Sequence, residues 1–369
     1  MTLQPTAREG GHRDMRGMRI MVRANNWIGD VVMISPALKA LRETYPGARI
    51  EVVARPHVAG CFAGHPWVDD VVLHEPRGRH RGVMGFRRLA LELRARRYDM
   101  AVLFQKAFSA ALLAFMAKAP KRVGFATDMR GALLTHPIEE TERDRSIHHV
   151  EYFLTVARSA GCDVSAIPRR VYFPLDDASR SFASERLAQA GASRFSFLAV
   201  IATGASKPPR AWPAERFAEL ARMLARDRGA GILVVGGPGD RADADVVLVA
   251  AGQSGIDAVG STTVRQMGAL IERCRVFVGN DSGPMHVAAA LDVPVLALFG
   301  PGVPAKTAPY MPPDRYVALT NGFHCAPCRQ DFFRECDPAP SMKPMCLETI
   351  TVAQAAAALN ALLERSSAA

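Results

Sequence analysis

The feature that most constrains this fold is an alternation of short apolar segments with helical patterns, which begins at Met18 and continues along the chain. Segments of this kind build βαβ units around a parallel sheet. The first half of the chain supplies five expected strands, at 18–23, 49–54, 68–74, 98–104 and 121–125. The second half supplies four more, at 195–201, 230–235, 276–279 and 293–299. The pattern therefore predicts an α/β protein with doubly wound sheets.

The length of the chain divides this series into two domains. A chain of 369 residues is too long for one ordinary core. We expect a disordered lead-in at 1–17, a first Rossmann-like domain at 18–175 and a second at 176–350. The last helix and tail, 351–369, are expected to pack back toward the first domain. Ligands of such sheets bind beyond the carboxyl ends of the strands, so two facing domains predict a cleft between them.

The composition is that of a soluble globular protein, with 49% hydrophobic and 22% charged residues. No stretch approaches the roughly 18 to 20 uninterrupted apolar residues of a membrane span. The first seventeen residues are polar and lack the apolar core of a signal peptide. These observations predict a protein that is not exported and that works in the cytoplasm.

The net charge of +10 comes with basic clusters that all lie in the first half, at 77–81, 87–88, 94–97 and 118–122. Excess basic charge favours an anionic partner, such as nucleic acid, an acidic glycolipid or an anionic membrane surface. Ordinary solvated helix faces would give the same pattern. No recognition helix, zinc-finger spacing or interleaving of aromatic with basic residues points to nucleic acid. Nucleic acid is therefore the least expected of these partners.

The clearest candidate site is the stretch Asn-Asp-Ser-Gly-Pro-Met-His at 280–286, between an apolar strand and a run of strong helix formers. Ser282 stands where an N-cap belongs, and Pro284 falls in the first turn, where its missing N–H costs nothing. The free N–H groups of that turn and the helix dipole favour a phosphate or carboxylate. A simple capped turn would show the same sequence. His286 can touch a bound phosphate or merely pack.

A second candidate follows the first expected strand, in a loop that runs through Asp30 and is followed by a helix to about Tyr45. A carboxylate at the carboxyl end of a strand can act as a general base toward an acceptor hydroxyl. Asp30 can equally serve as an N-cap or first-turn acid of the helix. Asn25 and Asn26, just before it, can bind a sugar or shape the turn.

Two loops of the second half carry groups suited to a donor substrate. Lys207 and Arg210 stand in a Pro-rich loop after the strand at 195–201. A guanidinium there can clamp phosphate oxygens and neutralise a departing diphosphate. Gly237 and Asp240 belong to a glycine-rich turn between a strand and a helix. That turn lacks the full spacing of a dinucleotide fingerprint or a P-loop, so it is a weak signal.

Four of the seven cysteines are grouped near the C-terminus, and they are Cys325, Cys328, Cys336 and Cys346. Four thiolates can close a tetrahedral structural metal site. Only the first pair has the spacing of a metal knuckle, so buried free thiols or disulfides remain alternatives. The other three cysteines look like small apolar fillers of the core.

Three motifs make the chain similar to glycosyltransferase family nine, which includes the ADP-heptose:lipopolysaccharide heptosyltransferases. They are Asn-Trp-Ile-Gly-Asp at 26–30, Arg-Ala-Trp-Pro at 210–213, and the stretch at 280–286 with its continuation at 293–301. The cysteine pattern is also similar to that of many members, especially those of the second-heptose type. The resemblance extends from about Met18 to the C-terminus.

The resemblance implies a GT-B fold, in which the C-terminal domain binds most of the donor and the N-terminal domain binds the acceptor. It also implies an inverting transfer without an essential divalent metal, and it matches Asp30 to the base. Arg210 stands where members often have lysine, which keeps the charge but changes its geometry. The positions matched to the donor diphosphate site are Asp281, Ser282, Gly283 and His286, and we expect Pro284, Gly237, Asp240 and Lys207 to contribute to donor binding.

The expected reaction moves a heptose from ADP-heptose to the inner core of lipopolysaccharide. The acceptor is then an anionic lipid-linked sugar at the cytoplasmic face of the inner membrane, and the nucleotide sugar is the co-substrate, with no cofactor required. One alternative is transfer of another sugar to outer core, O-antigen or another surface glycan. An alternative of another class is a nucleotide-sugar-binding protein without activity. A dinucleotide oxidoreductase is disfavoured because no Gly-x-Gly-x-x-Gly follows the first strand.

Overall fold

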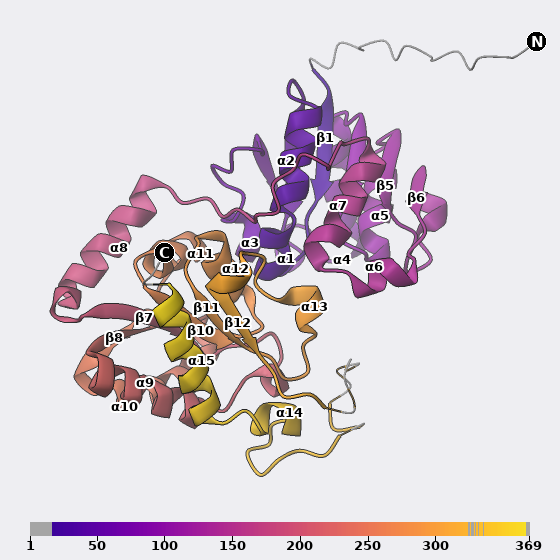
Figure 1. Ribbon diagram of the computed structural model, residues 1–369. Helices are drawn as coiled ribbons and strands as arrows, with labels where there is room; N and C mark the ends of the chain where they lie inside the picture. Colours follow the sequence, from indigo (N-terminus) through magenta and orange to yellow (C-terminus); the bar gives the residue numbers. More distant parts are fainter. Residues whose placement is uncertain are drawn as a thin grey trace, which may run out of the picture.

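The chain forms two parallel six-stranded sheets, each covered by helices, in its N-terminal and C-terminal halves (Figure 1). The structure is a computed structural model that describes residues 17–323, 325, 328, 330, 332–334 and 336–366. The strand orders are β3-β2-β1-β4-β5-β6 and β12-β11-β10-β7-β8-β9. This arrangement confirms the predicted α/β class. The expected disorder at 1–17 concerns residues that, apart from Gly17, lie outside the described part of the chain.

The N-terminal sheet is buried on both faces. Its strands are β1 (Arg19–Arg23), β2 (Arg49–Ala54), β3 (Asp70–Leu73), β4 (Met100–Leu103), β5 (Lys121–Phe125) and β6 (His136–Ile138). Its helices are α1 (Ile28–Met33), α2 (Ser35–Thr44), α3 (Pro56–Ala59), α4 (Gly82–Ala95), α5 (Phe108–Met116), α6 (Glu142–Ser146) and α7 (His149–Ala160). Ile20 and Val22 of β1 pack with α2 and α7, whereas Met21 packs with α4 and α5. This alternation follows from the two-residue period of a strand.

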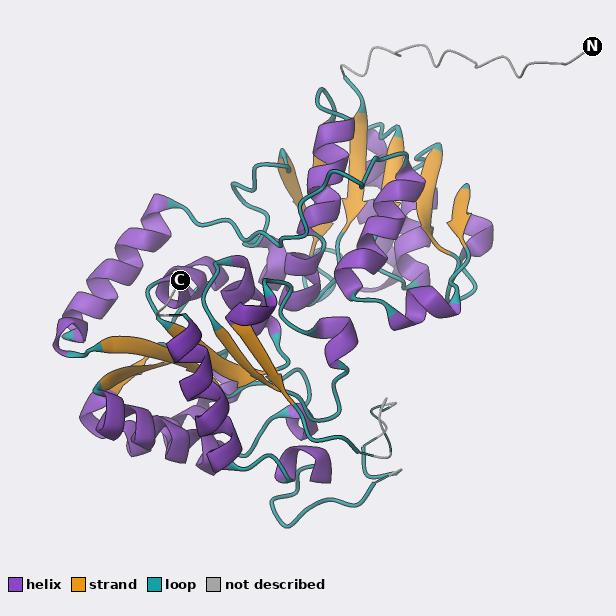
Figure 2. Ribbon diagram, in the orientation of Figure 1, coloured by secondary structure: helices purple, strands orange, loops and turns teal. Residues whose placement is uncertain are grey.

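The C-terminal sheet repeats the plan. Its strands are β7 (Phe197–Ala202), β8 (Ala230–Val234), β9 (Gly255–Asp257), β10 (Val276–Asn280), β11 (Val295–Leu298) and β12 (Tyr316–Leu319). Its helices are α8 (Asp177–Gln189), α9 (Ala214–Arg228), α10 (Arg241–Ala251), α11 (Val264–Glu272), α12 (Gly283–Ala290), α13 (Pro304–Thr307), α14 (Met345–Glu348) and α15 (Val352–Arg365). In Figure 2 the strand arrows of the N-terminal sheet point toward this half of the molecule. The loops after those strands therefore face the second sheet.

The C-terminal helix corrects one expectation. Instead of packing toward the N-terminal domain, α15 packs on α9, β11 and β12 of the C-terminal half (Figure 1). Leu359 and Leu362 are buried there, so the apolar face of α15 completes the cover of that sheet. The start of the helix is held nearby, because the Trp212 indole donates a hydrogen bond to the Ile350 carbonyl at 3.0 Å.

Local details also differ from the sequence expectation. The loop expected to run through Asp30 ends earlier, because α1 begins at Ile28 and Asp30 stands in its first turn. Strands β6, β9 and β12 were not predicted. They have three or four residues each and lie toward the edges of the sheets. Segments this short carry too little apolar periodicity to be recognised from sequence.

The two halves meet where the first turns of α1 and α12 approach each other. A Cβ atom on Gly29 would lie 2.6 Å from Cδ2 of His286, and one on Gly283 would lie 2.9 Å from Cβ of Ile28. Only glycine allows a backbone to come this close. The contact brings the carboxyl edge of β1 against the carboxyl edge of β10.

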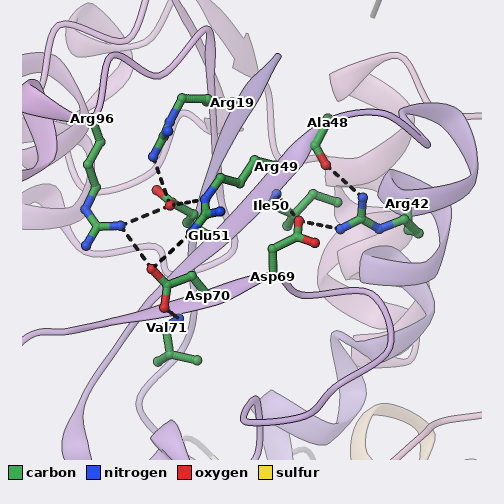
Figure 3. Close-up of polar contacts among 10 residues, drawn as sticks. All are labelled: Arg19, Arg42, Ala48, Arg49, Ile50, Glu51, Asp69, Asp70, Val71 and Arg96. Carbon is green, nitrogen blue, oxygen red and sulfur yellow. Dashed lines mark hydrogen bonds and ion pairs between the residues drawn. The ribbon is translucent and has the colours of Figure 1, made fainter. Parts of the chain in front are cut away.

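A buried carboxylate neutralises several arginines at the opposite, amino edge of the N-terminal sheet (Figure 3). Glu51 is fully buried, and its Oε1 accepts hydrogen bonds from Arg19, Arg49 and Arg96 at 2.9, 2.8 and 3.0 Å. Arg96 also reaches Asp70, at 3.2 Å. Burial by itself would raise the pKa of Glu51, but the Arg49 hydrogen bond, the nearby Tyr98 hydroxyl and the charges of Arg96 and Arg19 together outweigh it and lower the pKa to about 2.

We predict that Glu51→Gln destabilises the protein by about 3 kcal/mol at pH 7, because it leaves three arginines around an uncharged buried group. Urea unfolding measures the effect. Because the pKa of Glu51 is about 2 when folded and ordinarily near 4.5, its contribution is complete above about pH 4.5 and is lost as the pH falls toward 2. The gap between wild type and variant should therefore narrow over that range.

Glu43→Gln is the matched control for this prediction. Glu43 forms an exposed helix pair with Lys39, 2.7 Å away, and such pairs contribute only about 0.3 to 0.5 kcal/mol. Equal stability losses in the two variants would contradict a structural role for the buried carboxylate.

Candidate active site between the two sheets

A cavity of about 670 Å³ lies where the carboxyl ends of the two sheets face each other. Segments after β1, β7, β8, β9 and β10 all contribute to its lining. The predicted site residues that line it are Asn26, Asp30, Arg210, Gly237, Asp240, Asp281, Ser282, Gly283, Pro284 and His286. Among the predicted donor residues, all of which the structure describes, only Lys207 stands outside the lining. Its ammonium lies 5.5 Å from the centre of the Phe332 ring.

Asn280 joins the segments that follow β7 and β10. Its side chain is fully buried at the end of β10. The amide nitrogen donates to the Thr203 carbonyl at 2.8 Å, and the amide oxygen accepts from the Trp212 backbone N–H at 2.9 Å. The segment after β7 is therefore held against the turn after β10. Asn280 belongs to a motif recognised in the sequence, but its role as this connector was not predicted.

Arg210 reaches the cavity through this connection. Its guanidinium forms an ion pair with Asp281 and donates to the Ser206 hydroxyl at 3.1 Å. Burial raises the pKa of Asp281, while the Arg210 charge opposes that shift. A carboxylate beside an anion site would repel a phosphate unless it is neutralised. The geometry thus makes Asp281 a group that orients Arg210 and leaves the remaining donor atoms of the guanidinium for a ligand.

The amino end of α12 forms the floor of the anion site expected from the sequence. Ser282 is the residue before the helix, and Pro284 lies in its first turn. The Ser282 hydroxyl makes no capping bond, and its buried oxygen has no hydrogen-bond partner among the described residues. First-turn N–H groups have no intrahelical partner either. Several donors are therefore available to an anion at one point of the cavity wall.

His286 contributes packing rather than charge. Burial is the main cause that lowers its pKa to about 3, and the nearby His148 adds to the shift. The ring is therefore neutral at physiological pH and lies against Gly29 of α1. The packing that the sequence left open for His286 is present against Gly29, and contact of the ring with a bound phosphate stays a prediction.

Asp240 forms a second polar point on the donor side. Its carboxylate accepts a hydrogen bond from the Gly237 N–H at 2.8 Å, and burial raises its pKa. Gly204 and Gly236 press against it, because a Cβ atom on either would contact the carboxylate. A carboxylate so placed can accept hydrogen bonds from the hydroxyl groups of a nucleotide or sugar.

Asp30 lies in the first turn of α1 and lines the same cavity. The Asp30 carboxylate is partly exposed, and its nearest basic neighbour is His149, whose Nδ1 lies 3.8 Å from Oδ1. His149 lines the same cavity. This neighbour could not be predicted, because the two residues are far apart along the chain and only the packing of α1 against α7 brings them together.

A second cavity of about 510 Å³ adjoins the first and shares Asn26, Asp30 and His149 with it. Asn25 lines this second cavity, as does Gln105 at the end of β4. The side-chain carbonyl oxygens of both residues are buried and have no partner among the described residues. Such oxygens accept hydrogen bonds from ligand hydroxyls.

Two buried arginines hold the loops of this second cavity. Arg23 donates to the Val53 carbonyl at 2.8 Å and to the Asn26 side chain at 3.5 Å. Burial lowers the pKa of Arg23 to about 10, so it remains charged. Arg130 donates to the backbone carbonyl of Gln105. Gln105 was not predicted, although its position after a buried strand at the carboxyl edge is a signal that could have identified it.

The cysteines near the C-terminus line a third cavity. Cys325, Cys328, Cys336 and Cys346 all have free thiols, and burial is the main cause that raises the pKa of Cys346 to about 11. Within the described part of the chain no cluster of His, Cys, Asp or Glu has the arrangement of a metal site. Over the same residues, no helix has the length and apolar character needed to cross a membrane.

Comparisons with known proteins agree with this geometry. Residues 86–335 match the family model described as glycosyltransferase family 9 (heptosyltransferase). The chain is 31% identical over 315 residues to lipopolysaccharide heptosyltransferase 2 of Salmonella typhimurium, which covers 83% of this chain and 90% of that protein.

Solved structures show the same fold. The structure of E. coli ADP-heptose lipopolysaccharide heptosyltransferase II superposes with a TM-score of 0.76 at 27% identity, covering 95% of this chain and 100% of that one. A family 9 glycosyltransferase from Veillonella parvula gives a TM-score of 0.83 at 24% identity, covering 96% and 99%. These matches confirm the predicted GT-B architecture.

We predict that Asn280→Asp lowers stability by about 2 to 4 kcal/mol, because a carboxylate cannot donate to the Thr203 carbonyl and leaves it unpaired in a buried site. Thermal unfolding without ligand measures this loss, and calorimetry with nucleotide should show weaker binding. Asn360→Asp is the control, since the Asn360 oxygen accepts from Arg228 at an exposed site and keeps that role. Wild-type nucleotide affinity in Asn280→Asp would contradict the connector role.

Proposed function

Because the chain belongs to glycosyltransferase family 9, we propose that this glycosyltransferase moves a heptose from ADP-heptose to the inner core of lipopolysaccharide. The donor and acceptor are those named for its relatives. The observation that carries the proposal is that Asp30 and the amino end of α12, which belong to different sheets, line one cavity. A base and an anion site in the same cavity are what a transfer from a sugar diphosphate requires.

The donor diphosphate is proposed to bind at the amino end of α12. Its negative charge is matched there by the first-turn N–H groups, the Ser282 hydroxyl and the Arg210 guanidinium. Asp240 accepts hydroxyl hydrogen bonds from the same donor. Lys207 has no part in this scheme, because it does not line the cavity. With an arginine and a helix terminus available for the leaving group, the proposed reaction needs no divalent metal.

The proposed chemistry is a single displacement with inversion. Asp30 takes the proton from an acceptor hydroxyl as that oxygen attacks the anomeric carbon, on the face opposite the leaving group. The bond from the anomeric carbon to the diphosphate oxygen breaks, and its electron pair leaves with ADP. Arg210 and the α12 amino end stabilise the charge that develops on the diphosphate. His149 is near enough to hold the Asp30 carboxylate in place.

The acceptor sugar is proposed to occupy the second cavity, beside Asp30. The unpartnered oxygens of Asn25 and Gln105 would accept hydrogen bonds from its hydroxyl groups, and the Asn26 side chain lies at the boundary of both cavities. A lipid-linked acceptor of this kind places the reaction at the cytoplasmic face of the inner membrane, with the protein associated peripherally.

A panel of nucleotide sugars tests the whole proposal. Thermal shift and calorimetry would rank binding, and transfer to a lipopolysaccharide core acceptor would follow for each donor that binds. ADP-heptose should give both binding and transfer. Transfer of another sugar to a different glycan would favour the alternative within the family. Binding of a nucleotide sugar without any transfer would favour a non-catalytic binding protein.

We predict that Asp30→Asn lowers kcat by about 10² to 10⁴, the usual contribution of a general base. Donor affinity should change little, because the amide keeps the shape of the side chain and this residue is proposed to contact the acceptor hydroxyl rather than the diphosphate. Steady-state kinetics and calorimetry give the two quantities. Asp163→Asn is the control, at an exposed loop position. Wild-type turnover in Asp30→Asn would remove this residue from the mechanism.

We predict that Arg210→Ala lowers kcat/KM by about 10² to 10³, in line with the loss of one donor to a developing negative charge. Lys207→Ala is the matched control, because it removes a cation that belongs to the same loop and lies outside the cavity. It should lower kcat/KM far less. Arg210→Lys should recover part of the activity. Equal losses on removing Arg210 and Lys207 would mean that the loop acts through its overall charge alone.

A further inference from the structure

We propose that the carboxyl edge of the N-terminal sheet is a docking surface for an anionic lipid bilayer. We call its protruding side chains the apolar rim, and they are Val83, Met84, Phe108 and Met129. The inference rests on the proposed function only in that a lipid-linked acceptor gives such a surface a purpose. It assigns the membrane contact to particular elements, which the basic charge of the sequence could not do.

The rim residues are unusually exposed for their type. The exposed fractions are 85% for Val83, 72% for Met84, 46% for Phe108 and 94% for Met129. Single exposed apolar residues are ordinary in soluble proteins, but a group of them at one edge indicates an interaction site.

The topology brings these residues to one edge. Val83 and Met84 begin α4, which follows β3, and Phe108 begins α5, which follows β4. Met129 lies in the turn after β5. Parallel strands of one sheet end at the same edge, so the segments after three of them lie together.

Contacts within the structure support this grouping. Helices α4 and α5 contact each other and cover the same face of the sheet. Arg130 donates hydrogen bonds to the carbonyls of Gln105 and Ala107. Arg130, which follows Met129, therefore contacts Ala107, which precedes Phe108. This contact holds Met129 and Phe108 close to each other.

The charge around the rim suits an anionic surface. The segment 75–88, which ends in the first turns of α4, carries five arginines and one carboxylate. That carboxylate, Glu75, is paired with Arg79 at 2.6 Å. Arg87 and Arg88 are exposed, and helical spacing places them on the outer face of α4 that begins with Val83 and Met84. Arginines beside protruding apolar side chains match the interfacial region of a bilayer with anionic lipids.

The rim also borders the proposed acceptor cavity. Lys106 and Ala107, just before Phe108, line the second cavity. Asp128, just before Met129, lines it as well. A bilayer on the rim would therefore hold a lipid-linked sugar near the mouth of the cavity that contains Asp30. A protein partner has no comparable reason to sit beside a sugar site.

Vesicle co-sedimentation of the full chain tests the proposal. Vesicles contain phosphatidylcholine alone or with a third of phosphatidylglycerol, and neither donor nor acceptor is present. Wild type should bind the anionic vesicles in a manner that salt weakens. The double variant Val83→Ser with Met84→Ser should bind roughly tenfold more weakly, because two side chains that enter the interface are lost.

Val249→Ser is the matched control for the rim variant. Val249 is 82% exposed on α10, in the C-terminal half, and its replacement should leave vesicle binding unchanged. For the charge, Arg87→Gln with Arg88→Gln should weaken binding and reduce its salt dependence, whereas Arg226→Gln, exposed on α9, should not. Thermal melts would verify that every variant is folded.

Absence of vesicle binding by the wild type would overturn the proposal, and so would equal binding by the rim variant and Val249→Ser. Because the assay needs no turnover, it stands or fails separately from the proposed transferase activity. A further measurement links the two. The rim variant should keep full activity on a soluble, delipidated acceptor and lose activity on an acceptor embedded in vesicles. Loss on both acceptors would place the rim in the active site instead.

Discussion

The close approach of α1 and α12 is the constraint on which the proposed site depends. Gly29 and Gly283 have no side chains, so the first turns of two helices from different sheets can touch. His286 is confined in this contact as a neutral ring, and Asp30, one residue beyond Gly29, is held in the same cavity as the amino end of α12. A larger residue at either glycine would separate the base from the anion site.

The N-terminal sheet divides its charged groups between its two edges. At the amino edge, Glu51 pairs with three arginines, and these ion pairs lie outside both cavities that adjoin Asp30. At the carboxyl edge, the side-chain oxygens of Asn25 and Gln105 have no partner among the described residues. Unsatisfied polar groups cost stability, and a site that binds a ligand retains them because the ligand completes their hydrogen bonds. The side chains of the apolar rim are likewise left exposed, and the proposed lipid surface would cover them.

The periodicity of apolar residues was sufficient to predict the longer secondary-structure elements and insufficient to predict the shortest ones. The strand at 49–54 agrees with β2 and the strand at 230–235 agrees with β8 to within one residue, because each is a largely apolar run. Strand β6 has only His136, Pro137 and Ile138 and exists because it pairs with β5. The contacts of α15 also depend on its partner surface, so its placement on the C-terminal half could not be read from its own apolar face.

The sequence by itself determined the α/β class, the family, and the turns that supply Asp30, Arg210 and the 280–286 segment, since these follow from local patterns of apolar, glycine and polar residues. Only the tertiary structure decided how those groups act on one another. Asp281 pairs with Arg210, His286 loses its charge through burial, Lys207 lies outside the cavity, and His149 comes next to Asp30. The physical reason is that burial and ion pairing arise between residues far apart in sequence, and only the packed fold sets those distances.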